Sequence, residues 1–94
     1  MFDYNNFPTT NAYDGTQSTI QFGEYALSVV RHSGSYGGSE GLYEIAVFEE
    51  SDQVEMPGIT EDGDTVKGYL TKDEVDCILT KMFTITGCEP ISNV

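Results

Sequence analysis

Basic side chains are scarce in this chain of 94 residues: four lysines and arginines stand against sixteen acids, which gives a net charge of −12. Twelve of the sixteen acids lie between residues 40 and 76, a stretch that contains only two lysines. Nucleic acids and anionic membranes attract positive charge, so this chain should repel both. A basic protein surface is its natural complement. Solubility alone is the competing explanation, because acidic charge also keeps proteins monomeric.

Cysteines and long apolar runs are also in short supply. The chain has two cysteines, Cys77 and Cys88, whereas a secreted chain of this size usually carries several as a disulfide framework. No apolar run approaches the roughly 20 residues that span a bilayer. Residues 1–6 lack the basic start and apolar core of a signal peptide. We therefore expect a cytoplasmic protein with free thiols.

The residues that are present indicate one folded domain. Hydrophobic residues make up 38% of the chain and aromatic residues 12%, which is too apolar for a disordered segment. A chain this short can bury one modest core, but it leaves little room for a deep substrate cleft. Residues 1–18 show no sustained periodicity and predict an extended or irregular N-terminal arm. A single α+β domain should follow over residues 19–94.

Alternation of apolar and polar residues predicts a sheet in the middle of the chain. Residues 19–32 alternate in this way around Gly23, which we expect to mark a bulge or a bend. A second strand over residues 42–49 completes a long-looped antiparallel hairpin. Residues 54–56 and 66–70 are candidates for short strands. The pattern therefore predicts a three- or four-stranded antiparallel sheet.

The clearest signal is a C-terminal helix over about residues 72–84. Thr71 and Glu74 have the spacing of a capping box, which satisfies free amides at a helix start. Gly87 is placed to end the helix. Four apolar residues recur at helical spacing: Val75, Ile78, Leu79 and Met82. They form one apolar face, which we expect to pack on one face of the sheet.

Two motifs invite an enzymatic reading, and each lacks part of what the chemistry requires. His32 is the single histidine, and no local pattern pairs it with Cys77 or Cys88. The loop of residues 33–41 is rich in glycine, but it has no lysine and a strand follows it, unlike a phosphate-binding loop. We therefore expect no catalytic residue.

The acids Glu61, Asp62 and Asp64 resemble a sparse calcium loop. This segment departs from the EF-hand pattern at three positions, where Val66, Lys67 and Asp73 stand in place of ligands or glycine. A plain turn at Asp62 is the simpler interpretation. We expect no metal site and no cofactor.

Two features remain as candidate binding surfaces. The first is the acidic block of residues 40–76. The second is the sheet face away from the helix, where Val30, Ala46 and Phe48 would lie ringed by acids, unless the aromatic N-terminal arm covers them. Tyr36 adds a third element, because tyrosine among small residues suits adaptable interfaces. The candidate partner-binding residues are Tyr36, Glu44, Phe48, Glu49, Glu50, Asp52, Glu55, Glu61, Asp62 and Asp64.

Four segments resemble small acidic proteins of tailed bacteriophages: residues 41–48, 59–60, 64–71 and 73–75. The resemblance extends over about residues 20–87. It consists of strand, turn and capping residues, so no functional motif carries over. It implies expression in an infected bacterium, in the cytoplasm of the host. It also implies a host-takeover or anti-defence role, such as that of an anti-CRISPR or another enzyme inhibitor.

The leading hypothesis is a phage-encoded inhibitor that binds a bacterial host protein and occludes a basic surface that binds nucleic acid. Duplex DNA carries one charge per roughly 1.7 Å of its axis, and acids spread over all sides of a small domain cannot match that density. Only a local mimic of DNA is feasible, unless the acids of residues 40–76 lie on one face. The alternative is a structural or accessory phage protein that self-associates through strand edges, and the remotest is a small enzyme that uses His32 and a cysteine.

Overall fold

Three long antiparallel strands form the centre of the fold: β2 (Gly15–Phe22), β3 (Tyr25–Arg31) and β4 (Tyr43–Glu49). The computed structural model describes residues 2–93, so Met1 and Val94, the outer ends of the predicted arm and domain, lie outside it. β3 and β4 are the predicted long-looped hairpin, which is confirmed.

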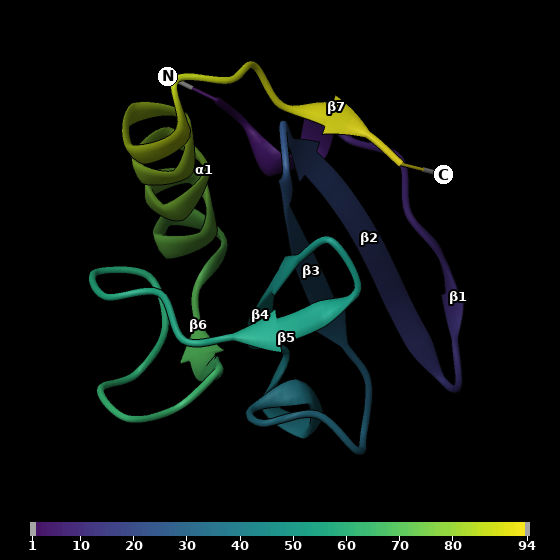
Figure 1. Ribbon diagram of the computed structural model, residues 1–94. Coiled ribbons are helices and arrows are strands. Elements are labelled where there is room, and N and C mark those ends of the chain that lie inside the picture. Colours follow the sequence, from purple (N-terminus) through teal and green to yellow (C-terminus); the bar gives the residue numbers. More distant parts are fainter. Residues whose placement is uncertain (1, 94) are drawn as a thin grey trace.

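Two short strands line each outer edge of this centre (Figure 1). β1 (Thr10–Ala12) and β7 (Ile91–Ser92) pair with β2, while β5 (Asp52–Val54) and β6 (Val66–Leu70) pair with β4. The α+β class and the antiparallel sheet are confirmed, but the sheet has seven strands rather than three or four. The prediction fell short because strands of two or three residues are too short to show a period of two.

The glycine at position 23 makes a hairpin turn rather than a bulge or a bend in one strand. Gly23 takes a φ of 63°, and Phe22 pairs directly with Tyr25 across the turn. A two-residue turn leaves the residues before and after it on the same face. Phe22 and Tyr25 are three residues apart, so the alternation resumes after the turn shifted by one position, which in the sequence resembles a bulge within a single strand.

Much of the predicted N-terminal arm belongs instead to the sheet, because β1 and half of β2 fall within residues 1–18. Only the segment before residue 10, with the short 3-10 helix η1 (Tyr4–Asn6), lies outside it. This segment packs on the helix side of the molecule. Phe2 meets Phe83 with ring centroids 5.6 Å apart, and Tyr4 meets Tyr43 at 5.4 Å.

The helix α1 (Lys72–Thr86) begins where the sequence predicts and runs two residues further. The capping box is formed: the Thr71 hydroxyl accepts a hydrogen bond from the Glu74 amide at 3.2 Å, and the Glu74 carboxylate accepts one from the Thr71 amide at 2.9 Å. The latter bond lowers the pKa of Glu74. Gly87, in the left-handed conformation, ends the helix as predicted. No helix within residues 2–93 is long and apolar enough to cross a membrane.

The core lies between α1 and one face of the three central strands (Figure 1). The four predicted helix residues are all buried, as are Leu27, Val29, Tyr43, Ile45 and Val47 of the sheet face towards α1. Tyr25 is only half-buried. Met56 and Ile59, in the acidic stretch between β5 and β6, are also buried and belong to the same core.

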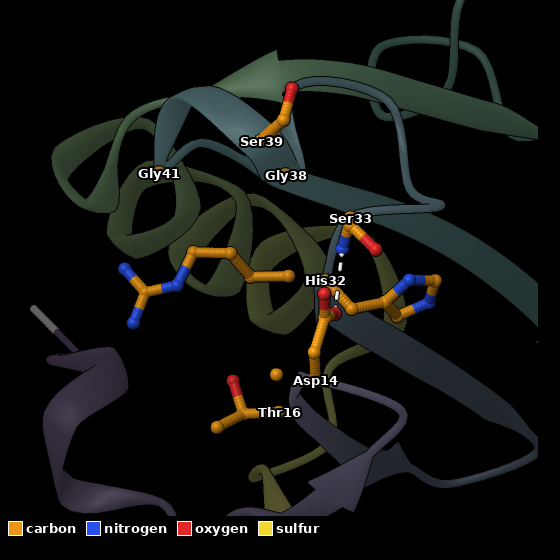
Figure 2. Close-up of a pocket in the computed structure, with 9 residues that line it drawn as sticks. Asp14, Thr16, His32, Ser33, Gly38, Ser39 and Gly41 are labelled. Carbon is orange, nitrogen blue, oxygen red and sulfur yellow. Dashed lines mark hydrogen bonds between the residues drawn. The ribbon is translucent and has the colours of Figure 1, made fainter.

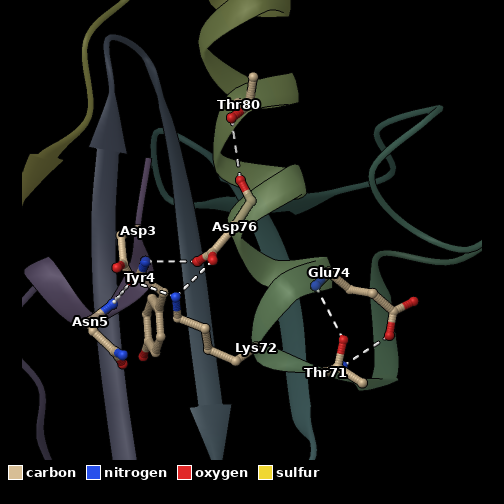
Figure 3. Close-up of polar contacts among 8 residues, drawn as sticks. All are labelled: Asp3, Tyr4, Asn5, Thr71, Lys72, Glu74, Asp76 and Thr80. Atoms are coloured by element: carbon tan, nitrogen blue, oxygen red, sulfur yellow. Dashed lines mark hydrogen bonds and ion pairs between the residues drawn. The ribbon is translucent and has the colours of Figure 1, made fainter. Parts of the chain in front are cut away.

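A charged network ties the start of the chain to α1 (Figure 3). The buried carboxylate of Asp76 accepts hydrogen bonds from the Tyr4 amide and from the Lys72 ammonium, both at 2.8 Å. Lys72 also pairs with Asp3. The hydrogen bond from Lys72 lowers the pKa of Asp3, and the two carboxylates raise the pKa of Lys72. The network therefore holds Tyr4 in the core.

Burial of Tyr4 predicts a transition at high pH. Its hydroxyl has no hydrogen-bond partner among residues 2–93, and burial beside Tyr43 raises its pKa to about 12. An unfolded tyrosine ionises at about pH 10. The stability that comes from burying neutral Tyr4 is therefore fully present below that pH and is lost as the pH rises towards 12. Circular dichroism should show unfolding in this window.

The Tyr4→Phe variant tests the assignment. It should unfold at a higher pH than the wild type and keep equal or slightly greater stability at neutral pH, because it removes a buried hydroxyl that lacks a partner. Identical alkaline transitions in the two proteins would show that another group drives the unfolding.

Candidate partner-binding site

Seven of the eight predicted acidic residues lie in β5, in the turn before it or in the loop after it, and β5 is a three-residue strand at one edge of the sheet. All seven are exposed: Glu49, Glu50, Asp52, Glu55, Glu61, Asp62 and Asp64. A strand rises about 3.3 Å per residue, so the turn before β5 and the loop after it stand only about 10 Å apart. We call these seven residues the acidic edge.

The loop between β5 and β6 carries four of these acids, and it is fixed from within. The Gln53 amide donates to the Thr65 hydroxyl at 2.7 Å, and the Gly63 amide donates to the Glu55 carboxylate at 2.6 Å. Met56 and Ile59 anchor the loop in the core. In Figure 1 the loop projects from the sheet below α1. Its buried residues therefore set its shape while its carboxylates face solvent.

The acidic edge keeps most of its negative charge. Within residues 2–93 its one ion pair joins the Lys67 ammonium to the Glu61 carboxylate at 3.9 Å, and the two side chains are 40% and 61% exposed. The Lys81 ammonium approaches the loop but donates to the Gly58 carbonyl, at 3.4 Å. The exposed carboxylates of the acidic edge repel one another and together attract a cationic surface.

Glu44, the eighth predicted acid, has a structural contact. It is half-buried in β4, and its carboxylate accepts a hydrogen bond from the backbone amide of Tyr36 at 2.8 Å. Glu44 therefore holds the glycine-rich loop beside β6, on the same side of β4 as the acidic edge. Tyr36 itself is 58% exposed.

Phe48 lies on the sheet face away from α1, as predicted, together with Val30 and Ala46. All three are partly buried. The aromatic residues of the N-terminal segment pack on the opposite face, so they do not cover this one. Glu44 is the single charged residue that the register of β2, β3 and β4 places on this face. The face is therefore nearly uncharged in a strongly acidic protein.

A pocket of about 450 Å³ surrounds the junction of β3 with the glycine-rich loop (Figure 2). In it, the Asp14 carboxylate accepts a hydrogen bond from the Ser33 amide at 2.9 Å, and this bond lowers the pKa of Asp14. Arg31 also lines the pocket, and its guanidinium lies 4.6 Å from the centre of the Tyr43 ring. The pocket thus contains one carboxylate and one cation that stacks on an aromatic ring.

The structure separates His32 from the half-buried thiol. The Nδ1 atom of His32 accepts a hydrogen bond from the Gly34 amide at 3.0 Å, and its ring packs on Tyr13. Cys88 lies beside Gly23, at the other end of β3, and a seven-residue strand spans about 23 Å. Cys88 and His32 therefore cannot interact in this fold.

Both cysteines are free thiols in the structure, as predicted. Cys77 is exposed on α1, and Cys88 is half-buried with its sulfur 3.5 Å from the Thr86 carbonyl. Replacing both by serine should therefore cost less than about 1 kcal/mol of unfolding free energy and leave binding unchanged. Thermal melts followed by circular dichroism measure the cost. Lost function with retained stability would revive the enzyme hypothesis.

The three acids of the calcium-like segment do not converge. Asp64 accepts a hydrogen bond from the neighbouring Thr65 amide, and Glu61 faces Lys67. Across the described residues, no group of three histidine, cysteine or carboxylate side chains is placed to hold a metal ion.

Sequence reasoning missed Tyr69, which is 60% exposed and lies against the glycine-rich loop. Its backbone amide donates to the carbonyl of Tyr36 at 3.2 Å. The strand over residues 66–70 was predicted correctly. Within it, the alternation around a buried Leu70 would have assigned Tyr69 to the outward side.

Compared with models of protein families, with curated proteins and with solved structures, the chain matches none of them.

Proposed function

We propose that this protein binds a basic surface of a bacterial host protein through its acidic edge and so keeps nucleic acid from that surface. The observation that carries the proposal is the gathering of seven exposed carboxylates around β5, with one weak ion pair among them. Carboxylates grouped in this way present negative charge as a short stretch of phosphate backbone does. The protein is then an anti-defence or host-takeover inhibitor of phage origin, which is what the resemblance to phage proteins implies.

The dimensions support a local mimic of nucleic acid rather than a full one. The molecule measures 33 × 29 × 25 Å. Duplex DNA as long as the longest of these dimensions carries about 20 charges. The acidic edge offers seven. It therefore competes for one part of a basic groove, and apolar contacts must supply the rest of the affinity.

A specific observation also favours the alternative, an accessory phage protein that self-associates. The face around Phe48 is not covered by the N-terminal aromatic residues and carries one charged residue, so two copies could approach there with little repulsion. Three of the four outer strands are less suited to pairing, because β1, β5 and β7 have only two or three residues each, whereas β6 has five.

The salt dependence of binding distinguishes the inhibitor from the self-associating accessory protein. The protein, immobilised, should retain a basic protein from a bacterial lysate at low ionic strength and release it as salt rises, because salt screens exposed charges. Mass spectrometry identifies what is retained, and sedimentation measures self-association in the same buffers. Retention that resists salt, or a dimer with no retained basic protein, would favour the accessory role.

A further inference from the structure

Tyr36 and Tyr69 meet at the sheet edge although they lie far apart in the sequence. They are 58% and 60% exposed, and they are two of the five large hydrophobic side chains that the described chain leaves exposed. Tyr36 is followed by Gly37, and Tyr69 is preceded by Gly68. The Tyr69 amide donates a hydrogen bond to the Tyr36 carbonyl, which joins the two segments.

The two glycines make this close approach possible. A Cβ atom on Gly68 would overlap the Cβ atom of Tyr36, and one on Gly37 would lie 2.9 Å from the Cα atom of Tyr69. Gly37 also has a φ of 87°, which other residues rarely adopt. The backbone is thus fitted to place both tyrosines on one patch of surface.

A β-bulge keeps Tyr69 outside the core. Leu70 pairs with Tyr43 and Lys67 pairs with Ile45, so one extra residue of β6 stands opposite Glu44. Tyr69 has a φ of 58°, in the left-handed region that tyrosine seldom occupies. The bulge buries Leu70 while it leaves the ring of Tyr69 in solvent.

The two tyrosines line a pocket of about 310 Å³ together with Glu61, Asp64 and Lys67. Aromatic faces attract cations, and carboxylates accept their hydrogen bonds. The one cation present, Lys67, lies 3.9 Å from Glu61, which is longer than a direct charge-assisted hydrogen bond. The pocket is therefore lined by two acidic and two aromatic residues against a single, loosely paired lysine, and one of the acids, Asp64, also accepts a hydrogen bond from the Thr65 amide.

We infer that this pocket receives an arginine side chain of the basic partner. A guanidinium group is planar, stacks on tyrosine, donates a two-pronged hydrogen bond to a carboxylate and is less strongly hydrated than an ammonium group. The inference rests on the proposed function and adds to it the side chain that is recognised. The acidic edge supplies long-range attraction, and the tyrosine pair supplies a preference for arginine over lysine.

Fluorescently labelled hexa-arginine and hexa-lysine peptides test the inference at low salt. Fluorescence anisotropy should show that the wild type binds hexa-arginine roughly three- to tenfold more tightly than hexa-lysine. The double variant Tyr36→Ala, Tyr69→Ala should lose this preference and bind both peptides as the wild type binds hexa-lysine. Circular dichroism checks that the variant is folded.

Tyr13→Ala is the matched control, because Tyr13 is also an exposed tyrosine with a positive φ, of 56°, and it lies at the β1–β2 turn. This variant should keep the preference for arginine. Equal affinity of the wild type for both peptides, or a preference that survives the double substitution, would overturn the arginine pocket and leave the proposed function standing. Failure of both peptides to bind would overturn the two together.

Discussion

Replacing Leu79 by alanine should lower the free energy of unfolding by about 2–5 kcal/mol, the range for large-to-small changes in a packed core. Leu79 is fully buried, and it lies at the centre of the apolar face that α1 packs on the sheet. The substitution leaves a cavity because the strands opposite cannot fully collapse into it. Urea unfolding followed by circular dichroism measures the loss.

Ile85→Ala is the matched control for Leu79→Ala on the same helix. Ile85 is 53% exposed, so its replacement should change the free energy of unfolding by no more than about 0.5 kcal/mol. A Leu79→Ala variant that loses no more than the Ile85→Ala control would mean that α1 does not pack on the sheet through this face.

Neutralising four carboxylates of the acidic edge should weaken binding to the captured partner by several tens of fold or more. The variant replaces Glu49, Glu50 and Glu55 by glutamine and Asp52 by asparagine, which keeps shape and hydrogen-bonding capacity. Single substitutions should have little effect, because individual exposed ion pairs contribute little. The combined loss appears mainly as slower association, since electrostatic steering depends on summed charge. Surface plasmon resonance measures both rates.

The control for total charge neutralises four exposed acids elsewhere. Asp14 and Asp73 become asparagine, and Glu40 and Glu89 become glutamine, so the net charge changes equally. This control should bind the partner far more tightly than the edge variant does. Equal losses in the two would mean that total charge rather than the acidic edge governs binding. Both variants should stay folded, because neutralisation reduces repulsion among like charges.

The helix and the central hairpin could be predicted because their signals are local. Thr71 and Glu74 are three residues apart, and the apolar face of α1 repeats within four turns. The same holds for the alternation in β3 and β4. In each case the neighbours in sequence determine the structure, so a single sequence suffices to reveal it.

The remaining strands depend on partners that are distant in sequence. β7 has only two residues and forms because it meets Gln21 and Ile20 of β2 at the other end of the chain. Met56 and Ile59 sit among acids and turns, yet the return of the loop towards α1 buries them. The periodicity of nearby residues predicts neither the strand β7 nor the burial of Met56 and Ile59.

The candidate site was predicted by its charge and missed in its shape. The acidic composition of residues 40–76 marked the acids of the acidic edge as candidates, but it did not show how the fold would group them. The pairing of Tyr36 with Tyr69 requires a bulge, two glycines and a hydrogen bond between the glycine-rich loop and β6. These are tertiary features, so the sequence could suggest Tyr36 as a contact residue but not its partner.

The most direct test of the central claim is the association rate with the captured partner, measured over a series of salt concentrations for the wild type and the edge variant. If the acidic edge steers binding, the rate for the wild type falls steeply as salt rises, and the rate for the edge variant starts lower and falls less. If both proteins associate at the same rate at every salt concentration, the acidic edge takes no part in binding.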